Sequence, residues 1–563
     1  MPWSTELLLL GTLTSVDGVS PPPPAELEID VQPPHARYMK ASWPETGVFE
    51  RPWTPSKRIG TVAAGTRLIV RGVVPSRDDG GCKGDDWLAI LPYGFICSRA
   101  LTEADEAPDG SLALQPDEGR LTPFQYAFVR SESAPLYANL EALEARQPSE
   151  TLERGMSLAV ARTAEFEGYE FVRTENGEYV PKADVRWGGQ GSAWHGVYIS
   201  GRYEGPSFAW AHKDKVPVRD APSPDAKRIG KLDRRERVPL LRSNGGAGKA
   251  KFFEIADGRW VAADDLNEVH LMAPPPGTAE ASRVRKGGSP QWIDVDLGEQ
   301  VLVAYRGDKP VYATLISSGR GNRTPRGNYP VWAKVASVDM GNQGYEDSRY
   351  LVQGVPWVEF FQAGIALHGT YWHDGFGQKK SHGCVNLSPT DARWVFEWLG
   401  PQMLAGWTGL LPHELDVSPV VHIRDSSRPE GSRWTQDAPI GPADPEEEKR
   451  KLAEAEERRT REAEAAAAMA ALDPGATGVD PSGSPPRLQP KLPAGFGAPS
   501  SPDVSGSVAG SGSGSGSGSG AGASGPAASP GGPSSPPAPS RPAAPAGTLP
   551  GLDDEGSRSG APG

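Results

Sequence analysis

A histidine and a cysteine in one short stretch carry the most reactive chemistry of this sequence. The stretch His368–Asn386 reads HGTYWHDGFGQKKSHGCVN and contains Cys384 sixteen residues after His368. A free thiol has a pKa of about 8.5, so a nucleophilic cysteine needs a neighbouring base to take its proton. Two further histidines, His373 and His382, are candidates for that base. Glycines around the turn leave room for a substrate to approach main-chain N–H groups, as in an acyl-transfer site.

Two other interpretations of these residues stay open at this point. His368, His373, His382 and Cys384 are all possible zinc ligands, although zinc sites in loops usually contain two close ligand pairs and this spacing specifies them poorly. The histidines could also be buried structural residues of a turn. We favour the cysteine nucleophile and expect no metal and no cofactor.

Composition and charge exclude several classes of protein. The formal net charge of −13 and the lack of a basic stripe argue against a nucleic-acid partner. No run approaches the roughly 18–20 apolar residues of a membrane span. Residues 1–20 contain no Lys or Arg and only a short apolar run, so they make no convincing secretory signal.

The three cysteines divide into a possible pair and a single thiol. Cys82 and Cys97 flank a strand-like segment and could meet across a hairpin, which makes them disulfide candidates and leaves Cys384 unpaired. A disulfide indicates an oxidising compartment, such as a periplasm or the cell exterior. The alternative is that both are small buried apolar residues.

Three β-rich units precede the cysteine motif. The sequence Lys57–Gly60 recurs as Lys227–Gly230, and each copy is followed by a strand-like run and a final aromatic-containing strand. A third unit with the same order lies between them. We place the units at residues 37–103, 121–187 and 205–270. Gly65–Ile96 resembles bacterial SH3-like domains, which implies small β-barrels that bind cell-wall material or act only as spacers.

The region that contains the motif, residues 290–425, is predicted to be a β-rich domain with one helix. Trp292–Leu297 alternates apolar and acidic residues as a half-buried strand does, and further strands leave His368 at a strand end. Ser388 and Pro389 are an N-cap and a first helical residue, which predicts a helix to about Leu399. The predicted fold class is therefore mainly β.

The two ends of the chain contain little that can form a core. Residues 1–36 are rich in proline, residues 444–472 predict a charged helix, and residues 473–563 are rich in Pro, Gly and Ser. Such a tail cannot bury enough apolar surface to become ordered.

The motif also resembles a known family. Ser381–Asn386 and His368–Thr370 are similar to the signature of the L,D-transpeptidase (YkuD-type) catalytic domain of bacterial cell-wall enzymes. The similarity covers about residues 291–424 and extends to Ser318-Gly319, Thr324–Gly327 and Val355–Trp357. Only twelve residues separate His368 from Ser381, which is short for this family and implies a short flap over the site.

The resemblance implies a role for each site residue. Cys384 would attack a peptidoglycan stem tetrapeptide and release D-Ala, with His368 as its base and the Gly369 carbonyl orienting the imidazole. The N–H groups of Gly383 and Cys384 would hold the oxyanion. His382 or the Tyr371 hydroxyl would assist them. Supporting roles would fall to Ser381, Trp372 and Asn386.

The resemblance also implies a location and partners. We expect a periplasmic or cell-envelope enzyme whose donor is a peptidoglycan stem peptide. Its acceptor would be a second stem amine, giving a 3-3 cross-link, or a lysine of an envelope protein. Two alternatives remain: an L,D-carboxypeptidase that uses water, and a peptidoglycan-binding scaffold with an inactive catalytic domain.

Overall fold

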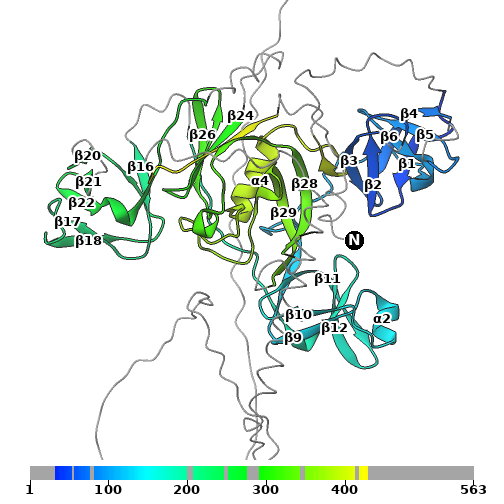
Figure 1. Cartoon of the computed structure of the whole chain (residues 1–563), viewed down its shortest axis with the longest axis horizontal. Coiled ribbons are helices and arrows are strands. Elements are labelled where there is room, and N and C mark those ends of the chain that lie inside the picture. The colour runs from blue at the N-terminus through cyan, green and yellow to red at the C-terminus, as the bar shows by residue number, and fades with distance from the viewer. Residues whose placement is uncertain are drawn as a thin grey trace, which may run out of the picture. The chain divides into compact units, whose positions relative to one another are not determined.

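The computed structural model describes residues 32–53, 56–75, 82–199, 207–245, 252–275, 291–342, 349–411 and 418–428, and residue 450. These residues form a mainly β structure with few helices, as predicted (Figure 1). The predicted segment 1–36 is described only from residue 32, the predicted helix 444–472 only at residue 450, and the predicted tail 473–563 not at all. In the described part of the chain, no helix is both long and apolar enough to cross a membrane.

Three modules precede the region that contains the cysteine motif. Module 1 comprises β1 (Tyr38–Ala41), β2 (Glu45–Phe49), β3 (Arg58–Ala63), β4 (Arg67–Val74), β5 (Trp87–Ile90), β6 (Phe95–Cys97) and β7 (Leu101–Glu103). Module 2 comprises β8 (Gln125–Val129), β9 (Ser133–Leu136), α2 (Leu140–Glu144), β10 (Glu150–Glu153), β11 (Ser157–Phe166), β12 (Tyr169–Thr174), β13 (Tyr179–Pro181) and β14 (Val185–Trp187). Module 3 comprises β16 (Phe208–Ala211), β17 (Val216–Arg219), β18 (Arg228–Leu232), β19 (Arg237–Pro239), β20 (Arg242–Ser243), β21 (Phe252–Ala256), β22 (Arg259–Ala262) and β23 (Leu266–Glu268).

The same strand pairing occurs in all three modules. The first strand pairs with the fourth and with the last, as in β1–β4 and β1–β7, β8–β11 and β8–β14, and β16–β19 and β16–β23. A single 3-10 turn comes directly before each last strand: Ser98–Ala100, Lys182–Asp184 and Ala263–Asp265. This shared order is what the repeat in the sequence indicates. The SH3-like barrel stays a prediction, as do the exact module boundaries.

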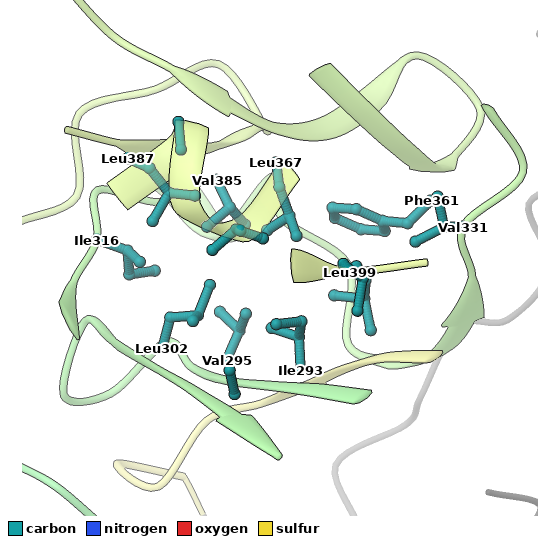
Figure 2. Close-up of a cluster of buried hydrophobic side chains, with 14 of the residues drawn as sticks. Ile293, Val295, Leu302, Ile316, Val331, Phe361, Leu367, Val385, Leu387 and Leu399 are labelled. Carbon is teal, nitrogen blue, oxygen red and sulfur yellow. The ribbon is translucent and has the colours of Figure 1, made fainter. Parts of the chain in front are cut away.

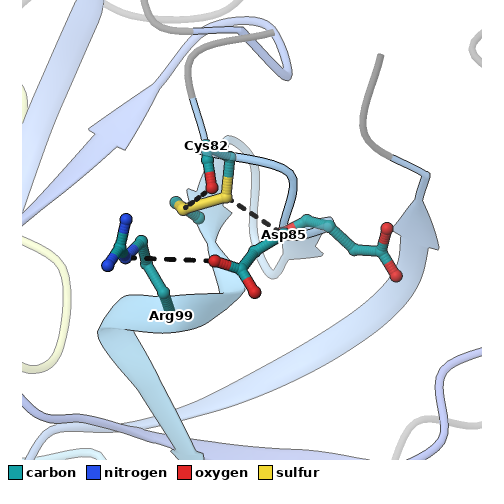
Figure 3. The surroundings of a disulfide bond; sticks show 5 residues. Cys82, Asp85 and Arg99 are labelled. Carbon is teal, nitrogen blue, oxygen red and sulfur yellow. Dashed lines mark hydrogen bonds and ion pairs between the residues drawn. A yellow bond between two sulfur atoms is a disulfide. The ribbon is translucent and has the colours of Figure 1, made fainter. Parts of the chain in front are cut away.

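A disulfide joins Cys82 and Cys97 in module 1 (Figure 3). Their Cα atoms are 5.6 Å apart, and the bond links the strand β6 to the segment that precedes β5. Beside it, Arg99 and Asp85 form an ion pair of 3.9 Å. Both cysteines pack with Trp87 and Phe95, so the bridge closes a small apolar cluster.

The region that contains the cysteine motif has two sheets. One has the strand order β15 (Val197–Tyr198), β26 (Lys309–Leu315), β25 (Val301–Arg306), β24 (Gln291–Asp296), β33 (Val420–Arg424) and β27 (Gly327–Pro330). In the other, β32 (Trp407–Leu410) pairs with β28 (Ala333–Gly341), which is followed in order by β29 (Leu351–Gln362), β30 (Ile365–Gly369) and β31 (Val385–Leu387). The predicted meander of β24, β25 and β26 is present with antiparallel register throughout.

A dry core lies between the first sheet and the strands that hold the motif. Ile293, Val295 and Leu302 of the first sheet cluster with Leu367 and Val385 (Figure 2). Burial of each such side chain stabilises the folded state by about 1.5–3 kcal/mol, so the strands β30 and β31 are firmly held. They are therefore a rigid base for the residues that follow them.

The predicted helix after the cysteine motif is present as α4 (Pro389–Trp398). The Ser388 hydroxyl caps its first turn by accepting a hydrogen bond from the Asp391 N–H, and Pro389 occupies the first helical position. Val395 packs into the core, and Trp394 and Trp398 stack on each other at its edge. The helix thereby covers one side of the core below the motif.

Candidate active site

The register of two parallel strands brings His368 and Cys384 to one face. In β30 and β31, Leu367 pairs with Val385 and His368 pairs with Asn386. Paired residues in a sheet point to the same side, and continuing the alternation of β31 back by one residue puts Cys384, which directly precedes the strand, on that side as well. From a rise of about 3.3 Å per residue and a strand spacing of about 4.8 Å, the two Cα atoms are about 8 Å apart. Side chains of this length can meet across that distance.

His368 is a buried, neutral imidazole. Its side chain is almost fully enclosed, and burial lowers its pKa to about 4, although the hydrogen bond to Gly369 opposes this shift. Nδ1 lies 3.1 Å from the Gly369 carbonyl oxygen, which can only accept, so Nδ1 carries the proton. Nε2 is then the basic nitrogen. The Trp372 ring stacks over the imidazole, with the two ring centroids 5.8 Å apart.

Cys384 is a partly exposed thiol that is protonated at neutral pH. Burial raises its pKa to about 11, against a smaller opposing effect of a backbone hydrogen bond from Ala366. Sγ donates a weak hydrogen bond of 3.8 Å to the Gly364 carbonyl. The resting pair is therefore a thiol and a neutral imidazole, not a thiolate and an imidazolium.

The turn before the thiol is held by Ser381. Its hydroxyl donates to the Cys384 carbonyl at 2.5 Å and accepts from the Gly383 N–H at 3.1 Å. The Gly383 N–H is thus already used within the turn, which differs from its predicted role as an oxyanion donor. A hydroxyl can satisfy both groups at once because it donates and accepts.

A second clamp reaches the turn from residues 317–324. The Thr324 hydroxyl donates to the Gly383 carbonyl at 2.6 Å and accepts from the Gly319 N–H at 2.8 Å. A Cβ on Gly319 would lie 3.0 Å from the Gly383 Cα, closer than ordinary contacts allow. Ser317 pairs with Asn386 in an isolated bridge. These contacts give a physical role to the small residues of this stretch.

His373 joins the same face through Asn386. Its Nε2 lies 2.9 Å from the Asn386 amide, and its Nδ1 accepts from the Gly375 N–H at 3.1 Å. Burial, together with the nearby Lys380 and His368, lowers the pKa of His373 to about 4. From the sequence, His373 is a candidate base, a possible zinc ligand or a buried turn residue, and its contact with Asn386 is not predicted. No local pattern signals a contact across thirteen residues.

Comparisons with known proteins relate one part of the chain to a family. Residues 290–421 match the family model of the YkuD L,D-transpeptidase catalytic domain. We call this part of the chain the YkuD-type domain, after the family model that it matches. A Bacillus subtilis protein named "Putative L,D-transpeptidase YciB" is 29% identical over 115 residues, which are 19% of this chain and 59% of that protein. The chain thus spans under two thirds of this curated relative.

Solved structures of similar proteins include two L,D-transpeptidases. The catalytic domain from Enterococcus faecium is 22% identical, with 24% of this chain and 99% of that chain covered and a TM-score of 0.19. L,D-transpeptidase 3 from Mycobacterium tuberculosis is 18% identical, with 24% and 62% covered and a TM-score of 0.20.

Two further predicted residues of the YkuD-type domain, His382 and Tyr371, lie in different surroundings. His382 is exposed and stacks on Tyr350, with ring centroids 4.5 Å apart. The Tyr371 hydroxyl donates to the Gln353 carbonyl at 2.6 Å, so its proton is not available for the predicted oxyanion role. In the described ranges, no group of three or more His, Cys, Asp or Glu residues is arranged to hold a metal.

The backbone of the YkuD-type domain is strained at Trp357 in β29, the strand that pairs with β30. Trp357 is buried and has a φ of 55°, a left-handed conformation that is rare for a bulky residue. The ideal Cβ of Gly369 would approach Trp357 to 3.2 Å. The close contact explains why the residue after His368 is a glycine.

Proposed function

We propose that this protein is a cell-wall L,D-transpeptidase that acts through Cys384. The observation that carries the proposal is the parallel register of β30 and β31, which brings Cys384, directly before β31, close to His368, whose imidazole is oriented by Gly369. In other sites with a nucleophile and a histidine base, a carboxylate orients the base. Here a backbone carbonyl takes the place of that carboxylate. The match of residues 290–421 to the family supports the substrate class.

The first proposed step forms a thioester. His368 Nε2 takes the thiol proton while Sγ bonds to the carbonyl carbon that precedes the terminal D-Ala of a stem tetrapeptide. The carbon–nitrogen bond then breaks, and the imidazolium returns the proton to the departing D-Ala amine. Because the resting pair is neutral, proton transfer accompanies the attack and does not precede it.

The second proposed step consumes the thioester. An acceptor amine gives a proton to His368 and attacks the thioester carbonyl, and Cys384 leaves as a thiol after taking that proton back. The Cys384 N–H is the oxyanion donor that the turn offers, because Ser381 occupies the Gly383 N–H. Losing one such donor typically costs about 10²–10³-fold in rate. His382 is the second candidate donor.

The proposed location is the cell envelope. A disulfide in module 1 supports an oxidising compartment. The proposed acceptor is a second stem peptide, with an envelope-protein lysine as the other amine of suitable chemistry.

Purified full chain should release D-Ala from a disaccharide-tetrapeptide, and a carbapenem should add its mass to the peptide that contains Cys384. Cys384→Ala and His368→Asn should abolish release, whereas His212→Asn in module 3 should retain it. Products with and without an added acceptor stem separate transfer from hydrolysis. Release that persists in Cys384→Ala would refute the proposal.

A further inference from the structure

The loop between His368 and Ser381 is attached to two modules that are distant in sequence. We call residues 370–380 the active-site loop. It supplies Trp372, which stacks over His368, and His373, which contacts Asn386. The position of this loop therefore determines what surrounds the base and the strand that follows the nucleophile.

Module 2 holds the start of the loop. The ring of Tyr371 stacks on Tyr126 of β8, with centroids 3.4 Å apart and planes inclined by 12°. Its hydroxyl is 2.9 Å from the Ser157 hydroxyl, and the Tyr126 hydroxyl donates to the Gly354 carbonyl at 2.8 Å. All of these side chains are buried. The contact is close, since a Cβ on Gly354 would come within 2.7 Å of Ala159 in β11.

Module 3 holds the middle of the loop. Arg235 donates to the Asp374 carboxylate at 2.6 Å and to its carbonyl at 2.8 Å. Arg234 donates to the same carboxylate at 3.0 Å and also to the carbonyl. Although burial raises the pKa of Asp374, hydrogen bonds from Ser192 and Arg235 keep that pKa below its ordinary value. Two guanidinium groups thus fix the side chain and backbone of one loop residue.

Arg235 occupies a costly conformation to make these contacts. Its φ is 65°, in the region that favours glycine, and its side chain is only 12% exposed. The guanidinium lies 5.2 Å from the ring centroid of Trp194 and 5.7 Å from that of Phe376. A strained, buried cation at a site of function is a recognised pattern, because strain persists only where surrounding contacts maintain it.

We propose that Arg235 and Tyr126 are positioning residues for the proposed transpeptidase, and that modules 2 and 3 hold the active-site loop over His368. The effect on turnover rests on the proposed function, but the placement of the loop does not. The modules are then part of the catalytic machinery as well as candidates for wall binding or spacing. A catalytic region without them is expected to fold around its own core but to have a loose loop.

Hydrogen exchange of the full chain tests the placement. Arg235→Ala and Asp374→Asn should each raise exchange in residues 370–380 at least tenfold and leave β30 unchanged. Tyr126→Ala should raise hydrogen exchange at the start of the loop. Tyr126→Phe should raise it less, because the aromatic ring remains. Arg237→Ala is the matched control, since this exposed arginine lies over Phe208 of its own module. Unchanged loop exchange in all three disrupting variants overturns the proposal.

Kinetics test the consequence for catalysis. Arg235→Ala should lower kcat about tenfold with less than a twofold change in KM, and Arg235→Lys should recover part of the loss because it restores one charged donor. A fall in stability alone would not give this split or this partial rescue. Equal kcat in Arg235→Ala and Arg237→Ala contradicts the positioning role. If the wild type has no activity at all, the proposed function fails, while the exchange experiment still decides whether the loop is held.

Discussion

His368 lies directly opposite Asn386 in the parallel register of β30 and β31. This single pairing determines much of the site. It places His368 two residues along its strand from the position opposite Cys384, on the same face. It also places Asn386 within hydrogen-bonding distance of His373. Sliding the pairing by one residue would turn the thiol to the opposite face of the strands.

The pH dependence of thiol chemistry should reflect a thiol and an imidazole that are both neutral at rest. Because the pKa of Cys384 is raised to about 11, alkylation by iodoacetamide should keep rising from pH 7 to beyond pH 10. Because the pKa of His368 is lowered to about 4, carbapenem acylation should decline only as the pH falls toward 4. A plateau in alkylation near pH 7 would indicate a preformed ion pair and contradict this account.

Gly319→Ala should disturb the catalytic turn without straining its own backbone. Gly319 has a φ of −62°, which alanine tolerates, so only the new methyl group acts. That group would meet the Gly383 Cα at 3.0 Å and the Thr324 hydroxyl at 2.9 Å. We expect acylation to slow by about 10²-fold, as for a displacement of roughly 1 Å. Gly189→Ala is the control, because a Cβ there meets open space.

The buried Lys334 should be important for the stability of the YkuD-type domain. Its ammonium donates to the carbonyls of Phe396 and Leu399 at the end of α4 and lies 3.7 Å from Glu359. Lys334→Ala should cost about 3–5 kcal/mol, since it leaves Glu359 buried without its cation. Lys334→Met with Glu359→Gln should recover much of the loss. Calorimetry measures both changes in stability, from the unfolding transition whose temperature shifts when Cys384 is acylated. Equal stability of wild type and Lys334→Ala would contradict this prediction.

His270 should make stability depend on alkaline pH. Its ring nitrogens lie 3.3 Å from Asp296 and 3.2 Å from Glu268. Burial alone lowers its pKa, but these two acids raise it from 6.5 to about 10 in the folded state. The stabilisation is therefore complete below pH 6.5 and is lost as the pH rises toward 10. Because the ring is one-third exposed, we expect this stabilisation to be on the order of 1–2 kcal/mol. His270→Gln should remove this pH dependence, and an equal decline in that variant would count against it.

Local patterns sufficed for the parts of the site that lie on regular elements. The alternation of Trp292–Leu297, the strand that ends near His368 and the Ser388 cap of α4 are all set by neighbours in sequence, and the structure contains them. The cysteine turn could be recognised because its residue types are unusual together. Such features depend on periods and caps that a sequence displays directly.

Contacts between distant segments could not be predicted in this way. Arg234 and Asp374 are 140 residues apart, and the residues around an arginine do not indicate which acidic residue it contacts. Asp391, in the first turn of α4, is fully buried and accepts hydrogen bonds from Tyr312, Thr314 and the Gly196 N–H. Each depends on the packing of separate modules or sheets, which no local period encodes.

The most direct test is a rapid-quench experiment with the full chain and a disaccharide-tetrapeptide. The account predicts a burst of one D-Ala per enzyme, and an acyl group whose mass appears on the tryptic peptide that contains Cys384. Cys384→Ala should give neither. D-Ala release without a burst and without an adduct on Cys384, or equal release by Cys384→Ala, would contradict the central claim that this thiol is the nucleophile.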